Sequence, residues 1–178
     1  MSVRQPAGAT ATYLIVSGSA TARRVPKLIG ALAPRVADLL TVLTPNAQRI
    51  VSPRELALVP GHRIIESYFD AAILPRPPDG VLLVAPCSFN TLNKLAQGIA
   101  DNLALSIAAE AIGRATPVIV AISVNGPLWA HPRAQQSVQD LRRWGVIVLD
   151  PVADANGWLT MPPIGVIVEQ VVMAVAAL

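Results

Sequence analysis

Residues 13–43, YLIVSGSATARRVPKLIGALAPRVADLLTVL, contain the pattern that decides the fold. The apolar run Tyr13–Val16 has the length and composition of a buried strand, and Leu39–Leu43 has the same character. Between them, apolar residues recur at helical spacing from Thr21 to Leu32. This stretch therefore predicts a strand, a helix and a second strand, in that order.

The same alternation continues to the end of the chain. Further strands are expected at 81–84, 118–122 and 146–149. Helices are expected at 90–113 with a break near Asp101 and Asn102, at about 133–144, and from Pro163 to Leu178. Strands that are apolar throughout are typical of a parallel sheet covered by helices on both faces. We therefore predict an α/β fold, a three-layer αβα sandwich with a mostly parallel sheet.

Length and composition indicate one globular domain. The 178 residues are close to the size of a single domain, and we expect a short tail at 1–12 followed by one domain at 13–178. Hydrophobic residues make up 53% and charged residues 14%, which excludes an intrinsically disordered chain. Aromatic residues make up only 4%, and the net charge of +3 comes from scattered basic residues, so no nucleic-acid partner is expected.

Cysteine content and hydropathy indicate a soluble protein of a reducing compartment. Cys87 is the only cysteine, so no intrachain disulfide and no multi-cysteine metal site can form, and we expect no metal and a cytoplasmic location. The most apolar stretch, 103–124, is interrupted by Glu110, Arg114 and Pro117, so no membrane association is expected. The mean hydropathy of +0.51 is high for a small monomer and predicts apolar surface buried between identical subunits.

Polar segments follow three of the expected strands. Ser17–Thr21 follows the first strand and opens a helix, Thr44–Ala47 follows the second strand, and Ser88–Thr91 follows the third. Free backbone N–H groups and hydroxyls at such turns suit a phosphate group, and turns on neighbouring strand ends converge on one site. An ordinary capped strand-to-helix turn is the alternative interpretation of each segment taken alone.

Two longer motifs carry a resemblance to a known family. Asn90–Leu103, NTLNKLAQGIADNL, resembles the extended PASANT motif of the homo-oligomeric flavin-containing Cys decarboxylases. Val124–Pro132, VNGPLWAHP, is similar to the PxMNxxMW stretch of that family. The resemblance covers roughly residues 13–172. It implies a Rossmann-like αβα sandwich that binds FMN near a subunit interface and assembles as a homotrimer or a homododecamer.

The resemblance also implies roles for individual residues. FMN would be bound by residues of all three turns, namely Gly18, Ser19, Ala20, Thr44, Asn46, Ser88, Phe89, Asn90 and Thr91. Asn90 and Asn125 would hold the carboxylate of the substrate and are the first two catalytic candidates. The implied reaction oxidises a cysteine thiol to a thioaldehyde, which then loses carbon dioxide to give an enethiol, with the cofactor performing the redox step.

The chain departs from the family pattern at three places. Ala72 stands where the family carries its active-site histidine, and His62 is the upstream histidine that could replace it, so His62 is a third catalytic candidate. A solvent-facing or capping histidine is the alternative interpretation of His62. The segment 150–158 lacks the cysteine with which phosphopantothenoylcysteine decarboxylases reduce the enethiol. Cys87 occupies an alanine position of the motif and is interpreted as a small buried residue.

These features together predict an FMN-dependent cysteine decarboxylase similar to the peptidyl-cysteine decarboxylases of lantibiotic-type biosynthesis. Its substrate would be a peptide or a small molecule that contains cysteine, and the favoured reaction converts the C-terminal cysteine of a peptide to an enethiol. Two alternatives stay open. One is an FMN-binding partner or scaffold protein without decarboxylase activity, which Ala72 favours. The other is a prenylated-flavin synthase, an enzyme of similar fold.

Overall fold

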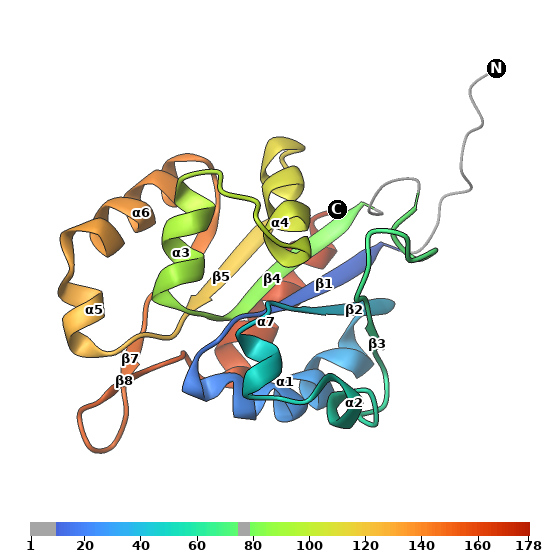
Figure 1. The fold of residues 1–178 in the computed structure, drawn as a ribbon, viewed down its shortest axis with the longest axis horizontal. Coiled ribbons are helices and arrows are strands. Elements are labelled where there is room, and N and C mark those ends of the chain that lie inside the picture. The colour runs from blue at the N-terminus through green and yellow to red at the C-terminus, as the bar shows by residue number, and fades with distance from the viewer. Residues whose placement is uncertain (1–9, 75–78) are drawn as a thin grey trace.

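The computed structural model describes residues 10–74 and 79–178, and a six-stranded sheet forms its centre (Figure 1). The strands lie in the order β3-β2-β1-β4-β5-β6, and every neighbouring pair is parallel. Their bounds are β1 (Ala11–Val16), β2 (Asp38–Leu43), β3 (Arg63–Ile64), β4 (Gly80–Cys87), β5 (Val118–Ile122) and β6 (Ile147–Leu149). A separate antiparallel hairpin consists of β7 (Val152–Ala153) and β8 (Leu159–Thr160).

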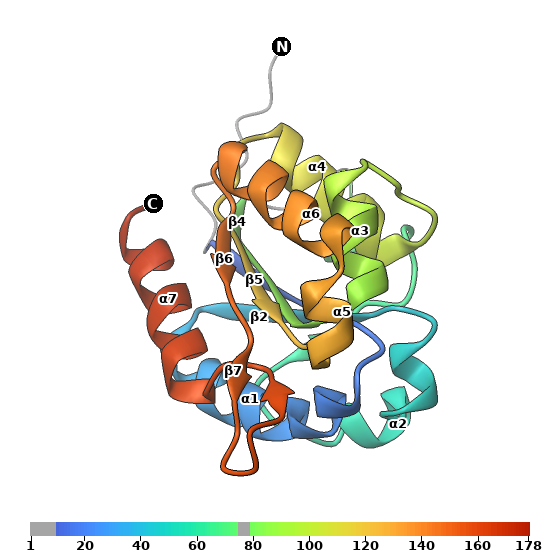
Figure 2. The ribbon, with the colours of Figure 1, turned by 90° about the vertical axis from the view of Figure 1, so that its left-hand side faces the viewer.

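Helices cover both faces of the sheet, as the side view in Figure 2 shows. One face carries α3 (Phe89–Ala96), α4 (Leu103–Gly113) and α6 (Pro132–Arg143), and the other carries α1 (Val25–Leu32) and α7 (Ile164–Ala176). Two shorter helices are α2 (Pro53–Leu56) and α5 (Gly126–Ala130). This arrangement confirms the predicted three-layer αβα sandwich. Within the described residues, no helix is both long enough and apolar enough to cross a bilayer.

The central strands direct alternate side chains into two cores. Tyr13 and Ile15 of β1 belong to the core beneath α3, α4 and α6, whereas Leu14 and Val16 belong to the core beneath α1 and α7. Successive side chains of a strand point to opposite faces of the sheet, and here helices cover both faces. This is why the sequence from Tyr13 to Val16 is apolar throughout rather than alternating with polar residues.

Most predicted elements are confirmed with shifts of a few residues, but the helix predicted at 21–32 begins differently. Its first part is a 3₁₀ helix, η1 (Ala20–Arg24), and the α-helix begins only at Val25. Pro26 explains the change. In an α-helix, a proline ring clashes with the carbonyl group four residues earlier, and the proline nitrogen has no hydrogen to donate to that carbonyl. The predicted tail at 1–12 lies mostly outside the described residues, and β1 already begins at Ala11.

The predicted break within 90–113 is confirmed. Helix α3 ends at Ala96, and Gly98 then has a φ of +68°, a left-handed conformation that cannot continue a right-handed helix. Asn102 starts the next helix, because its Oδ1 accepts the backbone N–H of Leu105 at 3.1 Å. The expected cap at the Asp101–Asn102 junction is therefore present.

The order of the strands opens a crevice at the centre of the sheet. The chain passes from β1 to β2 on one side of β1, and from β4 to β5 on the other side of β4. The loops that leave the carboxyl ends of β1 and β4 therefore diverge and leave a crevice between them. Ser17 joins the two loops, because its Oγ donates to the carbonyl of Pro86 at 2.7 Å and accepts the backbone N–H of Ser88 at 2.8 Å.

Candidate functional site

A cleft opens at the carboxyl ends of β1, β2, β4 and β5. Its larger part has a volume of about 580 Å³ and its smaller part about 180 Å³. The two parts share Gly18, Asn46, Ser88 and Asn90, so they adjoin. The other residues of the larger part are Ser19, Ala20, Thr21, Phe89, Ser123, Val124, Asn125, Leu128, Asp154, Leu159 and Thr160. Those of the smaller part are Thr44, Pro45, Thr91, Lys94, Asp101, Asn102 and Leu105.

Gly18 allows the turn after β1 to lie against the turn after β2. A Cβ atom at position 18 would stand 2.7 Å from the Cβ atom of Asn46, which is closer than non-bonded carbons approach. Thr44 anchors the second turn, because its backbone N–H donates to the carbonyl of Val16 at 2.9 Å and its Oγ1 accepts the N–H of Ala47 at 3.3 Å. The two turns that the sequence predicted to converge are therefore in contact.

Three hydroxyl groups form a cluster in the larger part of the cleft. Ser123 Oγ lies 2.8 Å from Ser19 Oγ and 2.7 Å from Thr21 Oγ1, and the latter two atoms are 3.3 Å apart. Ser123 follows β5 and the other two residues follow β1, so the cluster links loops of strands that are not neighbours. Each hydroxyl can donate one hydrogen and accept two, so the cluster can turn donors toward an anionic group.

Helix α3 begins at the cleft with Ser88 as its cap. Ser88 Oγ accepts the backbone N–H of Thr91 at 3.4 Å. The next residue, Phe89, is half-buried, and its ring meets that of His131 edge-on, with the centroids 5.3 Å apart and an angle of 75° between the planes. His131 is itself held in place, because its Nδ1 accepts the N–H of Arg133 at 3.0 Å. This contact orients the Phe89 ring at the wall of the cleft.

Asn90 and Asn125 both line the larger part of the cleft. Asn125 caps α5, because its Oδ1 accepts the backbone N–H of Leu128 at 3.0 Å. This bond engages the amide oxygen and leaves the Nδ2 hydrogens available for a ligand. Asn90 lies in the first turn of α3, is exposed, and makes no side-chain hydrogen bond within the described residues. The starts of α3 and α5 thus supply neutral amide donors to the same part of the cleft.

The smaller part of the cleft contains an ion pair. Nζ of Lys94, on α3, contacts the carboxylate of Asp101, and Asn102 Nδ2 donates to the same carboxylate at 3.1 Å. The hydrogen bond from Lys94 lowers the pKa of Asp101 below its ordinary value. The carboxylate is therefore ionised near neutral pH, and it balances the charge of Lys94.

The structure brings together every predicted site residue except His62. All nine predicted cofactor-binding residues and Asn125 line the cleft. His62 instead lies beside β2, because the next residue, Arg63, pairs with Leu40. Its Nε2 donates to the carbonyl of Leu56 at 2.9 Å, and its Nδ1 lies 2.8 Å from the Oγ1 of Thr41. Both ring nitrogens of His62 are therefore engaged away from the cleft.

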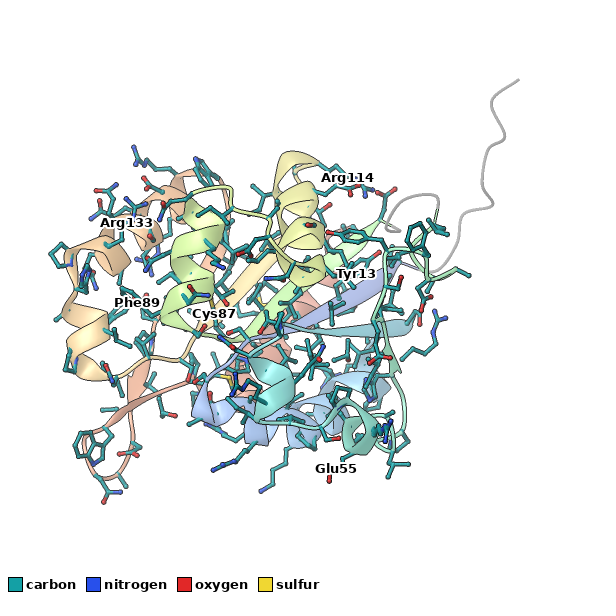
Figure 3. All side chains as sticks on the ribbon, in the orientation of Figure 1. Tyr13, Glu55, Cys87, Phe89, Arg114 and Arg133 are labelled. Atoms are coloured by element: carbon teal, nitrogen blue, oxygen red, sulfur yellow. The ribbon has the colours of Figure 1, made fainter. Side chains whose placement is uncertain are left out.

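Three other residues also lie outside the cleft, and the sequence singled out two of them, Ala72 and Cys87. Ala72 packs against the core beneath α3, α4 and α6, and Trp129 packs against the same core. Cys87, labelled in Figure 3, is completely buried, and burial raises the pKa of its thiol far above its ordinary value. A thiolate is therefore not available at Cys87, in agreement with its interpretation as a small buried residue.

Sequence reasoning missed part of the cleft lining. Ser123 stands directly after β5, the same signal that marked the turns after β1 and β2, and could have been found by applying that rule to every strand. Asp154, Leu159 and Thr160 belong to the β7–β8 hairpin, whose strands have two residues each. Strands that short show no periodicity, so no sequence signal marked this hairpin.

Comparison with known proteins identifies the family. The family model described as Flavoprotein matches residues 2–176, almost the whole chain. The chain belongs to the flavoprotein family. This confirms the predicted flavin-binding class. The phosphopantothenoylcysteine decarboxylase of Mus musculus is 31% identical to this flavoprotein over a 154-residue alignment that covers 78% of the chain and 71% of the mouse protein.

Two further matches place this flavoprotein among related proteins. The coenzyme A biosynthesis bifunctional protein CoaBC of Thermococcus kodakarensis is 24% identical over a 144-residue alignment that covers 78% of the chain but only 36% of that longer protein. The crystal structure of TvaF, an FMN-dependent cysteine decarboxylase from thioviridamide biosynthesis, has a TM-score of 0.74 and 25% identity, and the match covers 95% of this chain and 99% of TvaF. The relatives thus include decarboxylases of cysteine compounds.

The cleft of this flavoprotein fits a flavin. Its larger part combines the apolar side chains of Phe89, Val124 and Leu128 with hydroxyls and amides. A flat aromatic ring system with a polar phosphorylated chain needs such a mixed surface, and its usual site has a volume of several hundred Å³. Gly18 adds the close approach of two turns, which exposes backbone N–H groups where a side chain would cover them.

Proposed function

We propose that this chain is an FMN-dependent enzyme that decarboxylates the C-terminal cysteine of a peptide to an enethiol, in the biosynthesis of a peptide natural product. One observation carries the proposal: the amides of Asn90 and Asn125 line the same cleft as the residues that fit a flavin. FMN is the flavin assigned to the cleft, in keeping with the FMN-dependent relative TvaF. The substrate class and the reaction are the parts that experiment has to test.

The residues of the cleft have to orient the substrate rather than perform the oxidation. Bound FMN supplies the two-electron oxidation of the substrate's side chain from a thiol to a thioaldehyde. Asn125 donates from Nδ2 to the substrate carboxylate, and its own orientation is fixed by the bond from Leu128. Neutral amides hold a carboxylate less tightly than a lysine or arginine does, so they oppose its departure as neutral carbon dioxide less strongly.

The enethiol is the expected final product. Its reduction to a saturated thiol requires a reducing group at the substrate, and residues 150–160, which include the hairpin, contain no cysteine. Cys87, the single cysteine of the chain, is completely buried beside β5. Both facts support a closer functional likeness to the lantibiotic-type peptidyl-cysteine decarboxylases than to enzymes that reduce their product.

A second candidate function is an FMN-binding partner or scaffold protein without decarboxylase activity. Among the described residues, no histidine lines the cleft, and both ring nitrogens of His62 are engaged elsewhere. Oxidation of the thiol requires a group or a water molecule that accepts its proton, whereas binding of FMN requires none. This observation favours the alternative and makes activity the deciding measurement.

We also propose that the protein forms a homotrimer or a homododecamer and acts in the cytoplasm. Met173 and Val166 on α7 are 60% and 43% exposed, and the high mean hydropathy supports burial of such apolar side chains between copies. The fully buried single cysteine supports a reducing compartment. Sedimentation equilibrium measures the number of copies, and a monomer at all concentrations would contradict the oligomer.

Incubation of the FMN-loaded protein with peptides that end in cysteine tests the main proposal. Mass spectrometry should show the loss of carbon dioxide plus two hydrogens. The same peptide with a C-terminal carboxamide is the matched control, because it lacks the carboxylate that Asn90 and Asn125 would hold. If all cysteine-ended peptides stay unchanged while FMN is fully bound, the decarboxylase is ruled out. Activity gained by the Ala72→His variant alone would then support the alternative.

A further inference from the structure

The β7–β8 hairpin brings a carboxylate to the larger part of the cleft. Asp154 follows β7 directly and lines that part. Its Oδ1 accepts the backbone N–H groups of Asn156 at 2.8 Å and Trp158 at 3.0 Å. Its Oδ2 makes no hydrogen bond within the described residues. One oxygen thus holds the turn together, and the other is free for a ligand.

Asp154 gives this part of the cleft an unbalanced negative charge. It is the only ionisable side chain among the described residues that line the larger part. In the smaller part, by contrast, Lys94 and Asp101 balance each other. A ligand that reaches the hairpin side of the cleft therefore meets one carboxylate and no lining cation. Such a surface favours a positively charged group over a neutral or a negative one.

Trp158 stands opposite Asp154 in the hairpin, and its backbone N–H donates to the Asp154 carboxylate. The backbone N–H of Asp154 donates to the carbonyl of Trp158 at 2.8 Å, so the two residues face each other across the end of the hairpin. The turn between them includes Gly157, whose φ of +81° favours glycine. Trp158 is 71% exposed, and the hairpin projects from the body of the fold in Figures 1 and 2. An exposed indole attracts organic cations through its ring face, and a carboxylate binds them through a charge-assisted hydrogen bond.

We propose that the hairpin selects substrates that carry a protonated nitrogen close to the reacting cysteine, with Asp154 and Trp158 as the specificity-determining residues. The inference rests on the proposed function and names its substrate class: cysteine-ended peptides with a lysine or an arginine shortly before the last residue. Asn125 and Asp154 line the same part of the cleft. One short peptide can therefore place its carboxylate at the asparagines and its cation at the hairpin.

Three labelled peptides test this selectivity. They end in cysteine, carry fluorescein on the N-terminus, and differ only in the residue before the cysteine, which is lysine, glutamine or glutamate. In fluorescence polarisation with the FMN-loaded protein, the lysine peptide should bind about tenfold more tightly than the glutamine peptide, and the glutamate peptide least tightly. Added salt should reduce the difference, because Asp154 is exposed. The KM for decarboxylation should follow the same order while kcat changes little.

Conservative variants separate charge from structure. Asp154→Asn keeps an oxygen that can accept the N–H groups of Asn156 and Trp158, so the turn should persist while the charge is lost. The preference for lysine over glutamine should then fall to about threefold or less, and the discrimination against glutamate should disappear. Trp158→Leu should weaken binding of the lysine peptide about threefold, whereas Trp158→Phe should retain most of it. Unchanged melting curves verify that the variants are folded.

Each outcome separates this inference from the proposed reaction. The inference is overturned if the three peptides bind equally or if none of them binds. It is also overturned if Asp154→Asn leaves the preference for lysine intact. Each of these results counts even if the peptides are decarboxylated. A lysine preference that depends on Asp154, without any decarboxylation, supports the selectivity and rules out the reaction.

The cation can belong to a peptide side chain or to the amino group of a small cysteine substrate. Competition of the labelled lysine peptide with cysteine and with N-acetylcysteine distinguishes these two sources. If cysteine competes more strongly than N-acetylcysteine and Asp154→Asn abolishes this difference, the hairpin binds the amino group of a small substrate. If cysteine and N-acetylcysteine compete equally, the hairpin binds the side chain of the peptide.

Discussion

The cleft and the β2–β3 edge of the sheet both contain polar side chains, but their hydrogen-bonding capacity differs. In the cleft, Asn90 and Asn125 retain amide hydrogens that no described residue accepts. At the β2–β3 edge, both ring nitrogens of His62 are engaged, one by Thr41 and the other by Leu56. A polar group whose partners are all within the protein stabilises the fold, whereas a group with free donors can bind a ligand.

Asn125→Asp should have the largest effect on the cleft. Aspartate keeps an oxygen that can cap α5, but its second oxygen is anionic and repels the substrate carboxylate instead of donating to it. The kcat/KM for decarboxylation should fall at least about hundredfold, while the melting temperature and the FMN content stay close to those of the parent protein. Activity similar to that of the parent would exclude Asn125 from carboxylate binding.

Gly18→Ala should have the next largest effect. The new Cβ atom would stand 2.7 Å from that of Asn46, so the two turns must separate. We expect a loss of about 1–3 kcal/mol in the free energy of unfolding and a clear decrease in FMN affinity. Thermal denaturation and titration of the apoprotein with FMN measure both quantities.

Gly30→Ala is the matched control for this substitution. Gly30 lies in α1, and a Cβ atom there would have no other atom within 4 Å. Alanine in the interior of a helix should stabilise the protein by roughly 0.5–1 kcal/mol and leave FMN affinity unchanged. If both glycine variants lost FMN affinity equally, the close approach of the two turns would not be the cause.

The same comparison shows which site residues could be predicted from the sequence. Gly18, Thr44 and Ser88 each stand within two residues of the end of a buried parallel strand. Parallel strands in one sheet end at the same edge, so the position of such residues along the chain also places them in space. The family motifs add Asn90 and Asn125, which stand three residues after the ends of β4 and β5.

Residues far from a long strand could not be placed in this way. His62 lies in an irregular, proline-containing region between β2 and β4, and the short strand β3 pairs only its two residues with β2. Its partners are 21 and 6 residues away in the sequence, and no local pattern encodes them. In the hydroxyl cluster, strand ends place the residues, but no local pattern encodes their hydrogen bonds, because Ser123 bonds to residues more than 100 positions away.

His62→Ala should affect stability rather than turnover. It leaves the hydroxyl of Thr41, which is completely buried, without its hydrogen-bond partner. The free energy of unfolding should decrease by about 1–3 kcal/mol, as measured by urea denaturation. Under conditions where the variant is folded, kcat with a cysteine-ended peptide should stay close to the parental value. A large decrease in kcat without a loss of stability would instead support the catalytic role predicted for His62 from the sequence.

The smallest effect is expected from Lys94→Met, which removes the ion pair with Asp101 in the smaller part of the cleft. The hydrogen bond from Lys94 lowers the pKa of Asp101, so the folded chain holds this proton less tightly than the unfolded chain does. The stabilisation is therefore present above the ordinary carboxyl pKa of about 3.9 and is lost as the pH falls below it.

Lys94→Met should accordingly lower the melting temperature slightly at neutral pH and leave it unchanged in strong acid. The effect is small because the carboxylate is exposed to solvent. Lys27→Met is the control, because Lys27 is exposed on α1 and forms no ion pair within the described residues. A decrease of the same size at both pH values would show that Lys94 stabilises the protein through packing of its aliphatic chain, not through its charge.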